Sequence, residues 1–296
     1  MKLTARFTSL LAALCLLTGL LTSCISAVPQ QPAYDLSDLP EYDGTPYVVL
    51  NDNMPLFAEE DKTPVSFEYY SELDELERCG PAYACVSTDT MPTEKRGPIG
   101  SVKPSGWQTA KYDNVDGKHL YNRCHLLGFQ LTGENANAEN LITGTRYLNT
   151  QGMLPFENLI ADYVKETGNH VLYRVTPIFQ GVELVARGVQ MEGWSVEDEG
   201  EGVCFHVFAY NVQPGINIHY LSGLSWAEGD EPPILPSEPT EGQVEANYVL
   251  NTKSKKFHHP DCPGASKIAD ENRQDFTGTR ASLLESGYSP CGTCKP

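Results

Sequence analysis

The chain of 296 residues is short of basic side chains: Lys and Arg number 21 against 39 Asp and Glu, so the formal net charge is −18. A charge this negative argues against a protein that coats nucleic acid with its whole surface. The apolar fraction of 40% and the charged fraction of 20% exclude wholesale disorder, a collagen helix and a coiled-coil rod. No internal repeat is evident, and beyond the N-terminus no segment is apolar enough to cross a membrane.

The N-terminus has the pattern of a targeting segment. Lys2 and Arg6 precede an apolar run at residues 10–21, which predicts a signal peptide. Leu21-Thr22-Ser23-Cys24 resembles a bacterial lipobox, so we expect cleavage before Cys24 and lipid on its sulfur. The alternative is plain secretion, with cleavage after Ala27. Either way the prediction is an extracytoplasmic protein, as a lipoprotein of a bacterial cell membrane or in secreted form.

The rest of the chain divides by composition. Two Pro-rich acidic stretches are typical of extended connectors, and they separate a long segment with most of the aromatic residues from a short terminal one. The predicted organisation is a signal peptide at 1–23, a tether at 24–44, a main domain at 45–225, a linker at 226–243 and a terminal module at 244–296.

Hydrophobic patterns predict an α+β fold for the main domain. Apolar residues at positions 156, 159, 160, 163 and 164 have helical spacing, and Gly168 ends that helix. Short strands are expected at 47–50, 83–86 and 118–125, the last ending at His125. Three later segments alternate as strands and should form an antiparallel meander: 170–175, 184–191 and 204–212.

Charge is unevenly distributed within this domain. Residues 52–77 hold nine acids, whereas residues 92–146 hold seven bases against five acids. The simple interpretation is a solvated surface of mixed sign. The alternative is an electropositive cleft on an acidic body, which would bind a polyanion weakly and with strong salt dependence.

Cleavage of a phosphodiester needs a base that activates water, a cation that stabilises the developing negative charge and a group that protonates or coordinates the leaving oxygen. His125 lies at a predicted strand end two residues after Arg123. Asn149 follows on a short helix expected to begin near Asn140, and Glu157 comes eight residues later. An amide oxygen and a carboxylate suit Mg²⁺. Taken singly, each has a simpler explanation as a structural histidine, a turn-forming Asn or a Glu at a helix start.

Two motifs carry a family resemblance over roughly residues 80–225. The run Tyr121-Asn122-Arg123-Cys124-His125-Leu126-Leu127-Gly128 resembles the Asp-Arg-Gly-His motif of the DNA/RNA non-specific endonucleases, which are ββα-metal (His-Me finger) nucleases. The run at 138–153 is similar to that family's metal-binding helix, and the likeness is strongest to the DNA-entry nuclease branch. The resemblance implies a ββα-metal nuclease core on an antiparallel sheet.

The resemblance also implies roles for individual residues. His125 is the general base, Asn149 the direct ligand of Mg²⁺ (or Mn²⁺), and Glu157 orients the ion through one of its waters. Three further residues belong to the implied catalytic set: Asn140, which supports His125 or its loop, Arg123, which contacts the scissile phosphate, and Arg96, which supplies a second phosphate contact.

The sequence departs from the family motif twice. Asn122 stands where the family has Asp, and Cys124 stands where it has Gly. Asn122 removes a charge that could orient a nearby group, and Cys124 adds a side chain to a tight backbone. Neither change removes the base, the metal ligand or the orienting carboxylate, so we expect a competent site.

The terminal module has 53 residues, which is few for a stable hydrophobic core without a bound metal or disulfides. Cys291-x-x-Cys294 with upstream His258 and Cys262 is typical of a structural Zn²⁺ site. His258 is preferred over His259 because similar modules read Phe-His-x-x-x-Cys, although the spacing leaves both open. A disulfide and a redox Cys-x-x-Cys are the alternatives. We expect no catalytic role for the module.

Four of the nine cysteines have no assignment. Cys79 and Cys85 are close enough in sequence for a small-loop disulfide, whereas Cys124 and Cys204 can equally be small buried residues.

The sequence therefore predicts a Mg²⁺-dependent endonuclease at the cell surface, with DNA as substrate and RNA as a further candidate. Two rival hypotheses come from other classes. One is a non-catalytic surface protein that binds nucleic acid, against which the intact His125, Asn149 and Glu157 argue. The other is a secreted nuclease toxin, against which the lipobox argues, because an anchored protein does not readily leave the cell.

Overall fold

The structure of the protein is a computed structural model that describes residues 34–236, 245–294 and 296. The predicted signal peptide, Cys24 and the first part of the predicted tether lie outside the described residues. Within the described part of the chain, no helix has the length and apolar character needed to cross a membrane.

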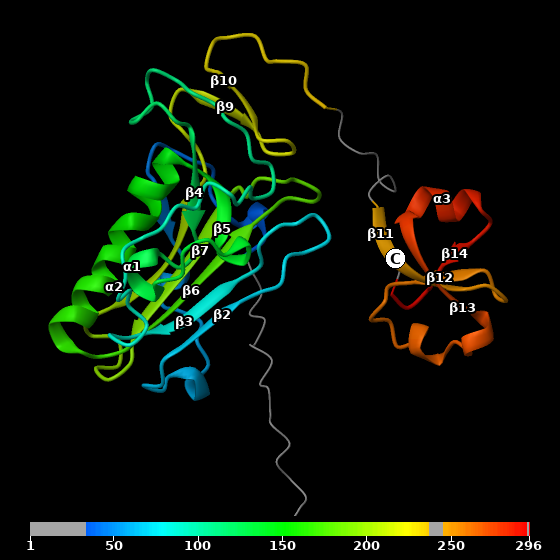
Figure 1. Ribbon diagram of the computed structural model, residues 1–296, viewed down its shortest axis with the longest axis horizontal. Helices are drawn as coiled ribbons and strands as arrows, with labels where there is room; N and C mark the ends of the chain where they lie inside the picture. Colours follow the sequence, from blue (N-terminus) through cyan, green and yellow to red (C-terminus); the bar gives the residue numbers. More distant parts are fainter. Residues whose placement is uncertain (1–33, 237–244, 295) are drawn as a thin grey trace, which may run out of the picture. The chain divides into compact units, whose positions relative to one another are not determined.

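The main domain is built on a six-stranded antiparallel sheet (Figure 1). The strand order is β1-β8-β7-β6-β3-β2. The strands are β1 (Tyr47–Val49), β2 (Phe67–Tyr70), β3 (Ala82–Val86), β6 (Val171–Ile178), β7 (Gly188–Ser195) and β8 (Cys204–Tyr210). The predicted antiparallel sheet with its three-strand meander is confirmed, since β6 pairs with β7 and β7 with β8. The middle strand begins at Gly188 and not at residue 184, because the amides of Leu184 and Val185 donate to the Tyr220 carbonyl instead.

One face of this sheet packs against the long helix α2 (Leu154–Thr167). Ile160, Ala161 and Val164 of the helix share a buried core with alternate residues of β8. Those β8 residues are Phe205, Val207 and Ala209. The helix ends as predicted at Gly168, whose φ of 74° is a left-handed conformation that glycine adopts without strain.

A separate two-stranded sheet positions the residues of interest. Strand β4 (Tyr121–His125) pairs antiparallel with β5 (Leu141–Thr145), and His125 lies opposite Leu141. A π-helix (Leu148–Met153) and α2 follow, so the chain runs β, β, α.

The expected helix from Asn140 onward is wrong in its first part. Asn140 closes a short 3₁₀ turn (Ala138–Asn140), and the next five residues form β5. Three of those five, Ile142, Thr143 and Thr145, are β-branched, which favours a strand. The buried amide of Asn211 holds β5 in place by accepting from the Thr145 amide and donating to the Thr143 carbonyl.

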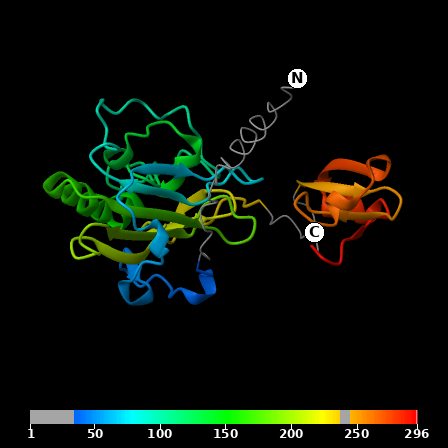
Figure 2. The same ribbon diagram turned by 90° about the horizontal axis from the view of Figure 1, so that it is seen from below.

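An N-terminal arm, defined here as residues 34–49, packs its first part on the opposite face of the large sheet and ends in edge strand β1. Apolar arm residues pack against Phe208 and Tyr210 of β8, and the Tyr210 hydroxyl donates to the Pro40 carbonyl at 2.8 Å. Figure 2 shows the arm in blue along one side of the sheet. The described part of the predicted tether, residues 34–44, therefore belongs to the folded domain, which begins before residue 45.

A hairpin closes the main domain, and a small module forms a separate core. The hairpin consists of β9 (Ile216–His219) and β10 (Leu224–Ala227), so the domain extends slightly into the predicted linker. The module has a four-stranded sheet in the order β13-β11-β12-β14 with one helix. Its elements are β11 (Glu245–Asn251), β12 (Lys256–His258), β13 (Arg273–Thr279), α3 (Arg280–Glu285) and β14 (Ser289–Pro290).

Candidate active site

A cavity of about 420 Å³ lies where the end of β4 meets the start of α2. His125, Asn149 and Glu157 all line it, although they come from three different elements. The other lining residues are Arg96, Ile99, Asn122, Arg123, Gly128, Phe129, Gln130, Arg146 and Leu154. The structure thus brings the expected base, the expected metal ligand and the expected orienting carboxylate to one cavity.

Both ring nitrogens of His125 have defined partners. Nε2 lies 2.8 Å from the Asn135 carbonyl oxygen, which can only accept, so Nε2 carries the proton. Nδ1 then has a free lone pair, and it lies 3.2 Å from a guanidinium nitrogen of Arg96. Burial lowers the pKa of His125, and the positive charge of Arg96 lowers it further against the opposing effect of the Asn135 hydrogen bond. The ring is therefore a neutral imidazole that can accept a proton at Nδ1.

Glu157 contributes a half-buried carboxylate that has no ion pair with the residues that the structure describes. Gly128 leaves room for it: a Cβ built on Gly128 would lie 2.7 Å from the carboxylate carbon. Burial raises the pKa of the Glu157 carboxyl to about 7, and the nearby Arg96 opposes this shift. A carboxylate in such a place is stabilised by a cation that approaches through the cavity.

Asn149 lies on the π-helix directly before α2. Insertions of this wider helical turn are rare and frequently occur at functional sites. The backbone carbonyl of Asn149 accepts from the Leu154 amide, so the side chain remains available to the cavity. An amide oxygen beside the Glu157 carboxylate is a donor set that fits Mg²⁺, because this ion takes few protein ligands and keeps most of its waters.

Both predicted phosphate contacts, Arg123 and Arg96, also line the cavity, and they differ in how firmly the guanidinium group is held. Arg123 is held in place, since it donates to the carbonyls of Val102 and Gly100 and stacks 4.0 Å from the centroid of the Trp107 ring. Arg96 is solvent-exposed, and its polar contacts with described residues are the one with His125 and a distant approach to the Phe129 ring. A rigid and a movable guanidinium thus face the same space.

Arg146 also lines the cavity, although sequence reasoning did not select it. Its guanidinium lies 2.8 Å from an Asp116 carboxylate oxygen, and that Asp side chain is 81% exposed. The sequence could have indicated Arg146, because it precedes Asn149 by three residues and so lies about one helical turn away from it.

Asn140 does not line the cavity. It is fully buried, and its side chain accepts from the Leu127 amide at 2.8 Å and donates to the Leu127 carbonyl at 3.0 Å. These bonds hold the backbone of the segment after His125, and the buried side chain cannot touch a substrate. Asn122, which replaces the family's Asp, does line the cavity, and its Nδ2 atom is buried without a described hydrogen-bond partner.

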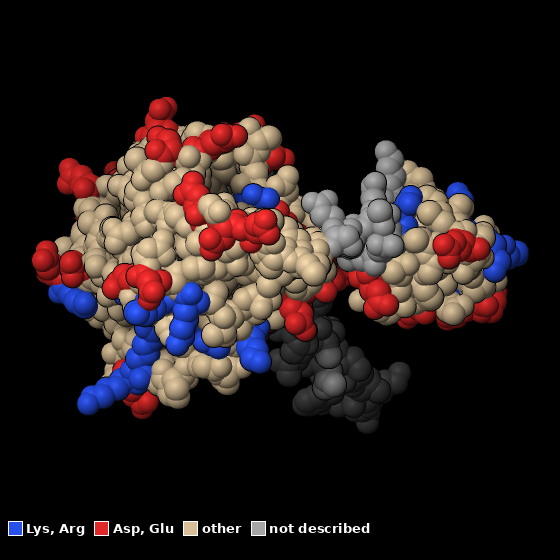
Figure 3. All heavy atoms as spheres, turned by 90° about the horizontal axis from the view of Figure 1, so that it is seen from above, with Lys and Arg blue, Asp and Glu red and all other residues tan. Residues whose placement is uncertain are grey.

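Positive charge gathers at this site on an otherwise acidic domain. Three guanidinium groups and a single carboxylate line the cavity. Figure 3 shows Lys and Arg side chains gathered along one side of the face it displays, while Asp and Glu side chains dominate the rest of that face. This arrangement is consistent with the electropositive cleft, which the sequence left open as an alternative to a solvated surface of mixed sign.

A second candidate site lies in the terminal module. His258, Cys262, Cys291 and Cys294 each offer one ligand atom, and these atoms all lie within 4.8 Å of one another. Nδ1 of His258 is buried without a described partner, and backbone amides donate to the sulfurs of Cys262 and Cys291. Such hydrogen bonds lower the pKa of Cys291 to about 7. Three sulfurs and one imidazole fit a tetrahedral Zn²⁺ site.

The open cysteine questions are answered for the described residues. Cys79, Cys85, Cys124 and Cys204 are all free thiols, so the Cys79–Cys85 disulfide considered above is absent. Burial raises the pKa of Cys79 and of Cys85 to about 12. The Cys124 side chain packs against Gly144 of β5, where a Cβ would meet its sulfur, so the strand pair accommodates the departure from the motif.

Comparison with known proteins gives matches over the main domain. The model of a family described as DNA/RNA non-specific endonuclease matches residues 59–196. A protein from Streptococcus dysgalactiae subsp. equisimilis named Deoxyribonuclease is 28% identical over 163 residues, which cover 53% of this chain and 46% of that protein. The chain thus spans about half the length of this relative.

Two solved structures share the fold of the domain. NucA from Streptococcus agalactiae, with magnesium ion bound, superposes with a TM-score of 0.55 at 22% identity, covering 61% of this chain and 87% of that one. Sda1 nuclease, with bound zinc ion, has a TM-score of 0.52 at 24% identity, covering 62% of this chain and 97% of that one.

The role of Asn140 leads to a stability prediction. Asn140→Ala leaves the buried amide and carbonyl of Leu127 without partners, so the free energy of unfolding should fall by about 3 kcal/mol. Urea unfolding followed by circular dichroism measures the change. Asn158→Ala is the matched control, because that exposed side chain bonds only Gln130 and should change stability by less than about 0.5 kcal/mol. Equal stability of the two variants would contradict the assignment.

Proposed function

We propose that this protein is a metal-dependent endonuclease that hydrolyses phosphodiester bonds of DNA, and of RNA as a second substrate, because residues 59–196 match the model of the DNA/RNA non-specific endonuclease family. The observation that carries the proposal is the single cavity lined by His125, Asn149 and Glu157. A neutral imidazole, an amide oxygen and an unpaired carboxylate are the groups that metal-assisted hydrolysis needs.

His125 acts as the general base in the proposed mechanism. Its Nε2–H is held by the Asn135 carbonyl, so Nδ1 is the atom that takes a proton from the attacking water. Arg96 occupies this position now, and its exposed side chain can turn toward a phosphate when substrate enters. Loss of the Arg96 contact frees the Nδ1 lone pair for the water.

Asn149 would bind Mg²⁺ directly and Glu157 would orient the ion through one of its waters, with Mn²⁺ as a substitute. When bound, the ion would supply positive charge at the leaving oxygen, and the expected products carry 5′-phosphate and 3′-hydroxyl ends. Arg123 and Arg96 bind the phosphate with charge-assisted hydrogen bonds. Because such contacts reach phosphates and not base edges, cleavage without sequence preference follows.

The terminal module is proposed to bind Zn²⁺ through His258, Cys262, Cys291 and Cys294, as a structural staple for a small core. The signal peptide and the lipobox at Cys24 support a place outside the cytoplasm, anchored to a bacterial membrane through lipid, although both lie outside the described residues. The similar protein named Deoxyribonuclease supports a nucleic-acid substrate.

The proposed mechanism ranks the effects of three substitutions. His125→Ala should lower the rate of plasmid cleavage by about 10²- to 10⁴-fold, and Asn149→Ala should do the same through loss of the ion. Arg96→Ala removes a phosphate contact of about 1.5–3 kcal/mol and should mainly weaken binding. Plasmid relaxation with Mg²⁺, Mn²⁺ or EDTA measures these rates.

The matched control for these variants is His119→Ala, which changes an exposed histidine of the same domain. It should cleave plasmid like the parent. If purified His125→Ala digests plasmid at the parental rate, the mechanism is wrong. If the parent binds DNA but never cuts it with any divalent ion, the protein is a binder and not a nuclease.

The zinc proposal separates two adjacent histidines. His258→Ala should lose the bound zinc, because it removes the one imidazole whose ligand atom lies within 4.8 Å of the three sulfurs. His259→Ala should keep one zinc per chain, since His259 stacks on Tyr248 instead. Metal content by plasma mass spectrometry is the measurement. Zinc retained by the first variant and lost by the second would reverse the assignment.

A further inference from the structure

The N-terminal arm lies outside the residues that match the family model, which begin at 59, yet it contacts the elements that carry the candidate metal ligands. The first contact is at Tyr147, the residue directly before the π-helix. The Tyr42 hydroxyl donates to the Tyr147 hydroxyl at 3.3 Å, and the Tyr147 hydroxyl donates to the Gly44 carbonyl at 3.3 Å. The two rings meet edge to face with centroids 6.2 Å apart.

The second contact is at Phe156, the residue directly before Glu157. The Tyr47 ring lies edge to face on the Phe156 ring, with centroids 4.9 Å apart. Phe156 in turn packs on Phe205 of β8 at 4.7 Å. Tyr47 belongs to edge strand β1, and 37% of its surface is exposed. The row of three aromatic rings therefore ends at the protein surface with Tyr47.

These contacts are important because a π-helix is not a stable conformation by itself. Its wide turn has poorer backbone geometry than an α-helix, and it persists where the surrounding structure determines it. Within the domain, the amide of Leu148 donates to Thr145 and the amide of Tyr147 donates to Gln213. The arm adds contacts on both sides of Asn149, one before the π-helix and one after it.

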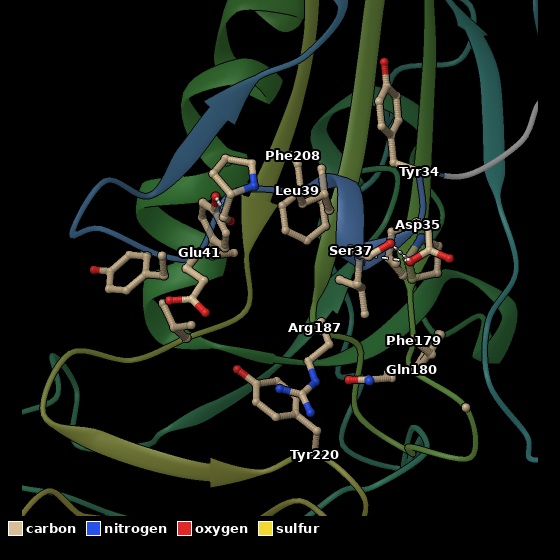
Figure 4. Close-up of a pocket in the computed structure, with 18 of the residues that line it drawn as sticks. Tyr34, Asp35, Ser37, Leu39, Glu41, Phe179, Gln180, Arg187, Phe208 and Tyr220 are labelled. Atoms are coloured by element: carbon tan, nitrogen blue, oxygen red, sulfur yellow. Dashed lines mark hydrogen bonds between the residues drawn. The ribbon is translucent and has the colours of Figure 1, made fainter.

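The packing of the arm against the domain differs along its length. Between its first part and the sheet lies a cavity of about 930 Å³ that includes Leu39, Phe208, Arg187 and Tyr220 (Figure 4). Figure 4 shows the Arg187 guanidinium beside the Tyr220 ring and the arm across the cavity from both. Tyr34 meets the His206 ring edge to face with centroids 5.7 Å apart, whereas the aromatic contacts of the arm with Tyr147 and Phe156 lie in its second part, at Tyr42 and Tyr47.

We propose that the N-terminal arm is a positioning element of the metal site: Tyr42 and Tyr47 hold the π-helix and the start of α2 so that Asn149 and Glu157 reach one ion. This inference rests on the proposed function. It assigns part of the metal affinity to residues that precede the family-matched segment and touch neither ion nor substrate. Supporting contacts of this kind are worth about 10- to 100-fold in metal affinity.

The test measures metal affinity directly in the full chain with its zinc site filled. Electron paramagnetic resonance measures the concentration of free Mn²⁺ in a titration and so gives the dissociation constant. The bound fraction that is lost in Asn149→Ala identifies the site. Tyr47→Ala should raise that dissociation constant by about tenfold. Tyr47→Phe should restore it, because the ring contact needs no hydroxyl. Excess Mg²⁺ should recover DNA cleavage by Tyr47→Ala.

The matched control is Tyr69→Ala, at the other edge of the sheet. Tyr69 lies on edge strand β2 and is 40% exposed, close to the 37% of Tyr47, and it contacts neither helix element. It should bind Mn²⁺ like the parent. Tyr42→Phe serves as the second variant, since it removes one hydroxyl and retains the ring, and should weaken binding about two- to fivefold.

The outcomes separate the two levels of the proposal. Unchanged Mn²⁺ affinity in both Tyr47→Ala and Tyr42→Phe overturns the inference, as does equal weakening by Tyr69→Ala. If the parent shows neither an Asn149-dependent Mn²⁺ signal nor DNA cleavage, the proposed function itself fails. A parent that cuts DNA with an intact Mn²⁺ site, beside arm variants of unchanged affinity, rejects only the role of the arm.

Discussion

The hydrogen bond between Nε2 of His125 and the Asn135 carbonyl is the contact on which the candidate active site depends. A carbonyl cannot donate, so this bond fixes the proton on Nε2 and leaves Nδ1 as the acceptor that faces the cavity. The same ring is held at the end of β4, and the buried amide of Asn140 fixes the backbone that follows. An imidazole fixed at the strand end can thus work beside ligands supplied by a different element.

The charges of the site are arranged against the character of the whole chain. A protein with a net charge of −18 places three guanidinium groups around one cavity and one half-buried carboxylate among them. Among the described residues Glu157 has no ion-pair partner, and the raised pKa of its carboxyl reflects the cost of desolvating it. An arrangement that is unfavourable for folding alone is favourable for binding a divalent cation and a phosphate.

The parts of the chain before and after the family-matched segment also carry groups that suit a metal site. The terminal module has a small core, and its His258 and three cysteines lie close enough to hold one ion, so metal binding there would be coupled to folding. The arm contacts the main domain through aromatic packing and two hydroxyl hydrogen bonds. In the proposed function both groups lie outside the matched residues, and one would act by ligation and the other by support.

Local patterns in the sequence determined the strand that ends at His125, the helix that Gly168 stops and the antiparallel meander, because hydrophobic periodicity and a left-handed glycine act over a few residues. The family motif also indicated which residues to seek. Only the tertiary structure decided that residues 141–145 form a strand, that His258 and not His259 faces the cysteines, and that residues 34–44 belong to the domain. Each of these depends on partners far away in sequence, and the convergence of His125, Asn149 and Glu157 on one cavity exists only once the sheets and helices have packed.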